Sequence, residues 1–194
     1  WSMLHLAGKA PHRSGRVSSN VRQHRKTTVP VTPFHFGPGA AIHAVAPRHV
    51  SFIAFCAANV IIDIESGYNL LRGADHVHTF LHSYIGATLV LLVVLVIHAA
   101  LGWAAARLPL PNLFQWRELT RTQVAWGVAL GAYSHIVLDS IMHADMQPLA
   151  PFTTSNALLR LVSLDALHVG CVVFGGFGVA ILVVRMVARG RSAA

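Results

Sequence analysis

The chain has 194 residues, of which 54% are hydrophobic and only 11% are charged, and its mean hydropathy is +0.56. Because soluble proteins carry about a quarter charged residues, this composition excludes an ordinary soluble domain and predicts an integral membrane protein. The formal net charge is +8. The lysines and arginines gather in the first 26 residues and at the ends of apolar runs, a pattern typical of membrane topology, so we expect no nucleic-acid partner.

Residues 1–30 are predicted to form a disordered basic tail, because they are rich in serine and arginine and show no apolar periodicity. They lack the apolar core of a secretory signal. The tail is either an anchor to anionic membrane lipid or the product of an over-extended gene start. We expect its histidines not to bind metal, and we expect a single membrane-embedded domain over residues 31–190.

Two uncharged apolar runs lie on either side of Pro47 within residues 37–62. The proline either kinks one long span or separates two short helices that form a hairpin. A hairpin would bring His35 and His43 back beside Asp63. Both arrangements remain open from the sequence.

Residues 83–106 contain no charge and are long enough to cross a hydrocarbon core of about 30 Å. Residues 122–142 and 166–184 are the next predicted spans, and loops with prolines at residues 107–121 and 144–163 join the three. The prediction is therefore an all-α, polytopic membrane helical bundle with about four hydrophobic helical units.

One span carries a column of metal-ligand residue types. His135, Asp139 and His143 follow one another at four-residue steps, which places them on one face of a helix. Such groups are costly inside a membrane unless they are paired, hydrated or bound to metal. The column is either a metal site or a polar seam in which histidine and aspartate satisfy one another.

Antiparallel spans would bring further ligand-type residues to the end of the membrane where this column ends. Because random placement would scatter histidines over both ends, a shared polar site is favoured. The residues expected there are Asp63, His78, His82, His135, Asp139, His143, Asp165 and His168.

The arginines predict which side this end faces. Only Arg72 and Arg160 lie at the membrane end where the shared polar site is expected. By the positive-inside rule this site should face away from the cytoplasm. A single first span agrees, because it leaves the basic tail inside, whereas a hairpin would put the tail outside. The arginines at the opposite end are Arg107, Arg117, Arg121, Arg185, Arg189 and Arg191.

Imidazole and carboxylate are ligands for zinc and, with more oxygen, for manganese or iron. More than four candidates indicate one to three ions with room for water, which suits hydrolysis by metal-activated water. Glu65 and His143 are the candidates for proton transfer, and Asp165 and His168 are further candidate ligands. The residues expected to bind metal are Asp63, His78, His82, His135 and Asp139.

Three segments resemble the YdjM-like family of bacterial inner-membrane, LexA-regulated, predicted metal-dependent hydrolases. Residues 59–65 resemble its leucine-proline-aspartate-x-aspartate signature, and residues 78–83 its histidine, threonine-histidine-serine segment. Residues 133–152 resemble its serine-histidine-x-x-x-aspartate segment with a later proline and phenylalanine. Family members usually carry a histidine in the first helix, which His35 matches best and His43 second, so the resemblance implies His35 as a further metal ligand and favours the hairpin.

The order of these histidines and aspartates is also similar to the zinc-dependent phospholipase C and P1 nuclease group. This similarity implies a phosphoester substrate, and for a site at a membrane face a lipid is the natural candidate. We therefore expect a membrane-embedded, zinc-type metal-dependent hydrolase acting on a small-molecule or lipid phosphoester. The alternatives are a non-enzymatic metal-binding or transport protein and a structural bundle that binds no metal.

Overall fold

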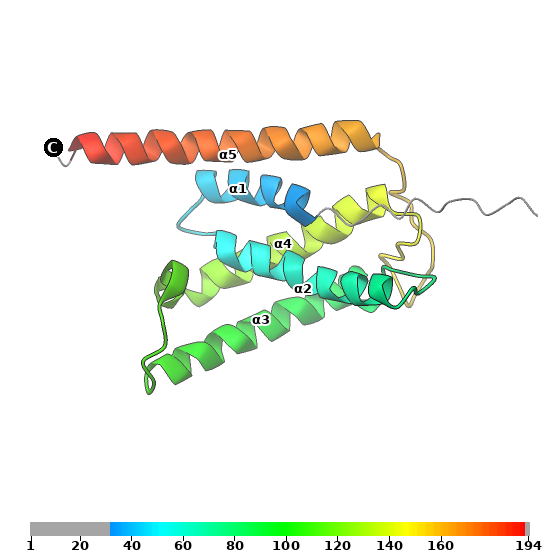
Figure 1. Ribbon diagram of the computed structural model, residues 1–194, viewed down its shortest axis with the longest axis horizontal. Helices are drawn as coiled ribbons and strands as arrows, with labels where there is room; N and C mark the ends of the chain where they lie inside the picture. Colours follow the sequence, from blue (N-terminus) through cyan, green and yellow to red (C-terminus); the bar gives the residue numbers. More distant parts are fainter. Residues whose placement is uncertain (1–31, 193–194) are drawn as a thin grey trace, which may run out of the picture.

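The computed structural model of the chain describes residues 32–192, so the predicted disordered tail lies outside the described residues (Figure 1). Every regular element in the described part is a helix, and the all-α prediction is confirmed. The elements in order are η1 (Thr32–His35), α1 (Phe36–Val45), α2 (Phe52–Leu71), η2 (Phe80–His82), α3 (Tyr84–Ala105), η3 (Leu113–Glu118), α4 (Arg121–Met142) and α5 (Leu164–Ser192).

Helices α1 and α2 form a hairpin around Pro47, as Figure 1 shows. Ser51 caps the second helix, because its side chain accepts a hydrogen bond from the Ala54 backbone N–H at 3.2 Å. His43 lies in the last turn of α1, next to the hairpin turn, with its Nδ1 2.8 Å from the carbonyl oxygen of Val50. The hairpin therefore returns α2 towards His35 but leaves His43 at the other end.

Three helices, α3, α4 and α5, are long and apolar enough to cross a membrane. Exposed apolar side chains such as Val96 on α3 and Phe174 on α5 face outward, as expected of surfaces in contact with lipid. Helix α1 has only ten residues, and α2 is not among the three. The predicted count of about four membrane units is therefore not confirmed.

Helix α4 is the centre of the bundle and packs between α2 and α3, whereas α5 packs mainly on α1. The buried apolar residues of α4 recur every four positions and form one stripe. Similar stripes on α2 and α3 face it. The core residues of these three helices are Ala54, Ala58, Ile62, Ala87, Val90, Val94, Val124, Val128, Ala132 and Ile136.

Within the described residues, the hairpin changes the charge count that predicted the orientation by one residue. Arg48, in the turn between α1 and α2, joins the six arginines of the end opposite to Arg72 and Arg160. The six basic residues of the first 26 lie outside the described residues, so the side that the polar site faces stays a prediction.

Gly131 sets how closely α4 approaches α2. A Cβ atom at this position would lie 2.5 Å from the carbonyl oxygen of Phe55 and 3.0 Å from its Cα. Because both neighbours are backbone atoms, the helices would have to move apart. Since Gly131 lies one turn before His135, this close packing positions the polar cluster described below.

Gly131→Ala should therefore destabilise the protein by about 1–3 kcal/mol, the usual cost of overpacking, although alanine favours an isolated helix by about 1 kcal/mol. Gly102→Ala in α3 is the matched control, because nothing lies within 4 Å of its added Cβ. Thermal unfolding in detergent, followed by circular dichroism, measures the difference. Equal midpoints for the two variants would contradict the packing argument.

Candidate metal centre

Five separate segments supply side chains to one buried cluster at the end of the bundle. Helix α4 contributes His135 and Asp139 in its last turns, and His143 caps its C-terminus. The remaining members come from η1, α2, the loop after α2, and η2. They are His35, Asp63, His78 and His82.

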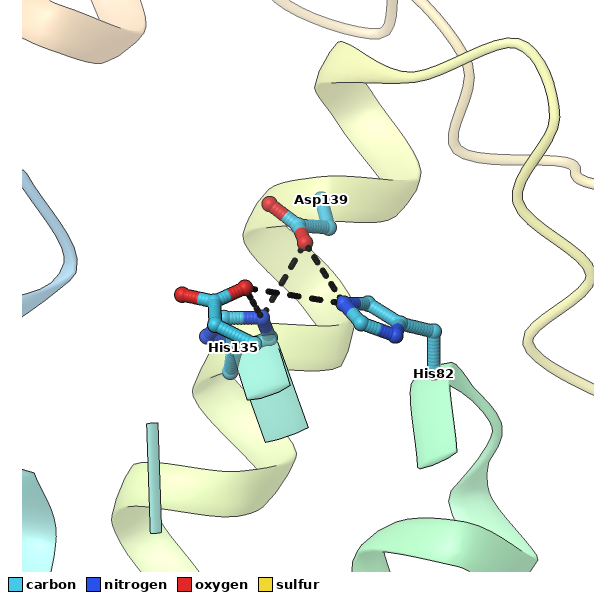
Figure 2. Close-up of side chains that lie close together, drawn as sticks. His82, His135 and Asp139 are labelled. Atoms are coloured by element: carbon cyan, nitrogen blue, oxygen red, sulfur yellow. Dashed lines mark ion pairs between the residues drawn. The ribbon is translucent and has the colours of Figure 1, made fainter. Parts of the chain in front are cut away.

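The first metal group consists of Asp63, His82, His135 and Asp139, whose ligand atoms all lie within 4.8 Å of one another. His135 Nε2 lies 3.4 Å from Asp63 Oδ1 and 3.1 Å from Asp139 Oδ2, and His82 Nε2 lies 3.7 Å and 3.6 Å from the same two oxygens. Figure 2 shows His82 and His135 converging on one oxygen of Asp139 from opposite sides. The group presents two nitrogens and two oxygens to a common centre.

The second metal group consists of His78, Asp139 and His143. His143 Nε2 lies 3.8 Å from Asp139 Oδ1, the oxygen not used by the first group, and the rings of His78 and His143 stack with centroids 4.3 Å apart. His35 approaches the same oxygen, with its Nε2 at 3.1 Å, and stacks on His135. The carboxylate of Asp139 is thus shared between the two groups.

The separations in the first group fit a tetrahedral ion better than a set of direct hydrogen bonds. Zinc bonds of about 2.0–2.1 Å place neighbouring ligand atoms about 3.3–3.4 Å apart, close to the 3.1–3.7 Å found between these nitrogens and oxygens. Charge-assisted hydrogen bonds are shorter, about 2.7–2.9 Å. Moreover, Nε2 of His35, His78, His82 and His135 is buried without a hydrogen-bond partner, as expected of atoms that ligate a metal ion.

Two hydrogen-bond acceptors behind the cluster, Asn59 and Asp145, orient its imidazoles. Asn59 Oδ1 lies 2.9 Å from His135 Nδ1, and the Asn59 amide is fixed because its nitrogen donates to the Phe55 carbonyl at 2.8 Å. Asp145 Oδ1 lies 3.0 Å from His78 Nδ1. Each acceptor holds the proton on Nδ1, so that the lone pair of Nε2 faces the cluster, which is the usual arrangement around metal-bound histidine.

Glu65 takes the corresponding place behind His82. Its Oε2 lies 3.5 Å from His82 Nδ1 and accepts a hydrogen bond from the Leu81 backbone N–H at 2.7 Å. This position is opposite to the nitrogen that faces Asp63 and Asp139. Glu65 was expected to transfer a proton, but its position instead favours orienting His82.

Asp145 connects the loop after α4 to the loop after α2 by hydrogen bonds, in addition to orienting His78. Burial opposes ionisation of its carboxyl, but the nearby His78 and the N–H groups of Val77 and His78 outweigh this effect and lower its pKa to about 2. Burial also lowers the pKa of His78 and His143. Both imidazoles are therefore neutral at neutral pH, the form that binds metal.

Surrounding carboxylates favour positive charge at His82. Burial lowers the pKa of this imidazole, but the nearby carboxylates of Asp63, Glu65 and Asp139 outweigh burial and raise it. An environment that stabilises an added proton in this way also stabilises a metal cation.

The structure brings together all six residues expected to bind metal, together with His143, and leaves three further candidates outside. His43 lies in the last turn of α1 at the opposite end, Asp165 is exposed, and the ring of His168 lies tilted against that of Phe34 with centroids 4.7 Å apart. Reasoning from the sequence missed the orienting roles of Asn59 and Asp145. Only the four-residue step from Asn59 to Asp63 carried a signal, because acceptors behind ligands have no characteristic spacing.

No family model, curated protein or solved structure matches this chain. The candidate metal centre therefore rests on the geometry and chemistry of the chain's own residues.

Metal content should distinguish shared from unshared ligands. We expect two divalent ions per wild-type chain, one in Asp63→Asn and none in Asp139→Asn, because only Asp139 belongs to both groups. Elemental analysis of detergent-purified, zinc-reconstituted protein measures this. A well-folded wild type without metal would favour the polar seam, and equal losses in the two variants would contradict the sharing of Asp139.

Asp145→Asn should weaken metal binding at the second group about 10–100-fold, the usual effect of removing a partner behind a ligand, and leave the first group unchanged. Asp165→Asn is the matched control, because Asp165 is exposed and belongs to neither group. Competitive chelator titration gives the two affinities. An unchanged second affinity would show that His78 needs no orienting carboxylate.

Proposed function

We propose that this chain is a membrane-embedded, metal-dependent hydrolase acting on a phosphoester, with a lipid-like substrate as the natural candidate. The observation that carries the proposal is the shared carboxylate of Asp139, which belongs to two adjacent groups of buried imidazole and carboxylate ligands. Two neighbouring divalent ions bound there would supply an activated water and neutralise charge that develops on a phosphoryl oxygen. A purely structural metal site is instead closed and single.

The residues of the chain divide this work. His82, His135, Asp63 and Asp139 would hold the first ion, and His78, His143 and Asp139 the second, with His35 beside it. Asn59, Glu65 and Asp145 keep the imidazole lone pairs directed inward.

His143 holds the second ion in this proposal and is not the group that accepts a proton, although the sequence predicted that role. It is less buried than His35, His78 and His82, and burial lowers its pKa, which keeps the ring in the neutral form that binds metal. An imidazole that binds an ion through Nε2 carries its proton on Nδ1 and has no lone pair left to accept another.

We also propose distant membership of the YdjM-like family. The three segments that resemble its motifs converge in space, since Asp63, His82, His135 and Asp139 form the first metal group. These residues lie as much as 76 positions apart in sequence. Their convergence on one site supports the interpretation that the three segments are motifs of a common function.

Zinc- or manganese-loaded protein should hydrolyse a chromogenic phosphodiester, and Asp139→Asn should reduce the rate at least about 10³-fold, because several kcal/mol of charge stabilisation are lost. The variant should still insert into the membrane. Asp165→Asn should match the wild type. Metal-loaded wild type that turns over no phosphodiester or phospholipid would instead favour a metal-binding or transport protein, and full activity in Asp139→Asn would contradict the assigned site.

A further inference from the structure

A pocket lies at the end of the bundle opposite to the metal groups. It has a volume of about 420 Å³ and is formed by the turn between α1 and α2 and by the last turns of α5. Its polar lining is entirely basic or imidazole, and no acidic side chain of the described residues lines it. The lining residues are Val45, Ala46, Pro47, Arg48, His49, Arg185, Ala188 and Arg189.

The pocket lies where α5 would leave the hydrocarbon core. Arg185 follows Asp165 by 20 residues along one continuous helix, which at 1.5 Å per residue is about 30 Å. This distance equals the thickness of a typical hydrocarbon core. With Asp165 near one boundary, Arg185 and Arg189 therefore lie in the headgroup region of the other leaflet.

The chemistry of the pocket selects its ligand. Guanidinium groups bind phosphate through paired, charge-assisted hydrogen bonds, and Arg48, Arg185 and Arg189 all line this cavity. Apart from His49, the other lining residues are apolar: Val45, Ala46, Pro47 and Ala188. An anionic group attached to an apolar body fits this combination better than a free, fully hydrated anion does.

We propose that this pocket binds the phosphate headgroup of an anionic phospholipid. Basic pockets between membrane helices are suited to such headgroups. The site is separate from the metal groups and does not depend on the proposed hydrolase activity.

Arg185 connects the pocket to the packing of α1. Its guanidinium donates a hydrogen bond to the carbonyl oxygen of Ala44 in the last turn of α1. A phosphate held by Arg48 and Arg189 would neutralise the repulsion among the three arginines and allow Arg185 to keep this bond. The bound lipid therefore supports the contact between α1 and α5.

Lipid retention in native mass spectrometry tests the proposal. Detergent-purified full-length chain is titrated with phosphatidylglycerol, with phosphatidylcholine, and with inorganic phosphate. The test variant is Arg48→Gln/Arg189→Gln, which keeps Arg185 and its bond to α1. The control is Arg121→Gln/Arg191→Gln, which removes the same charge at the same membrane end but outside the pocket.

One phosphatidylglycerol should bind the wild type and the control with similar affinity. The test variant should bind it about 30-fold more weakly, since each basic residue near an anionic headgroup contributes about fivefold. Equal weakening in both double variants would show a diffuse basic surface and overturn the proposal. Equal retention of phosphatidylcholine, or competition by millimolar inorganic phosphate, would also overturn it, the latter by showing a site for a free anion.

Discussion

The rest of the structure depends on one buried carboxylate, that of Asp139. It is 2% exposed at the end of an apolar bundle, where an uncompensated charge costs several kcal/mol. Four imidazoles surround this charge and approach its two oxygens from three separate parts of the chain: those of His35, His82, His135 and His143. The charge of Asp139 therefore requires η1, η2 and α4 to meet at the same end of the bundle.

Close helix packing makes this meeting possible. Glycine and alanine along α4 and α2 let the two backbones approach, so that Asp63 on α2 lies beside His135 on α4. In lipid, where apolar burial gives no driving force between helices, such small-residue contacts are a main source of association. The outer helices α3 and α5 instead present large apolar side chains to the surroundings. The polar site thus lies where the backbones of α2 and α4 approach closely.

The sequence predicted the spans and the cluster better than it predicted the helices that carry the ligands. Four-residue spacing correctly placed His135 and Asp139 on one helix face, but His78 and His82, with the same spacing, lie in a loop and a 3-10 turn, and belong to different metal groups. Pro47 was compatible with a kink or a hairpin, because the choice depends on contacts with α5 that local sequence does not encode. Helix α1 separates His35 from His43, which the family resemblance ranked second, by its own length.

Proton positions in the cluster distinguish a metal site from a polar seam. Asn59 and Asp145 accept the Nδ1 protons of His135 and His78, so Nε2 of a neutral ring has only a lone pair to present to the cluster. Lone pairs facing carboxylate oxygens repel unless a cation lies between them. Two divalent ions held here would meet the inward nitrogens and oxygens of both groups. With the two inward carboxylates of Asp63 and Asp139 they would leave a net charge of about +2, which an anionic phosphoester is suited to neutralise.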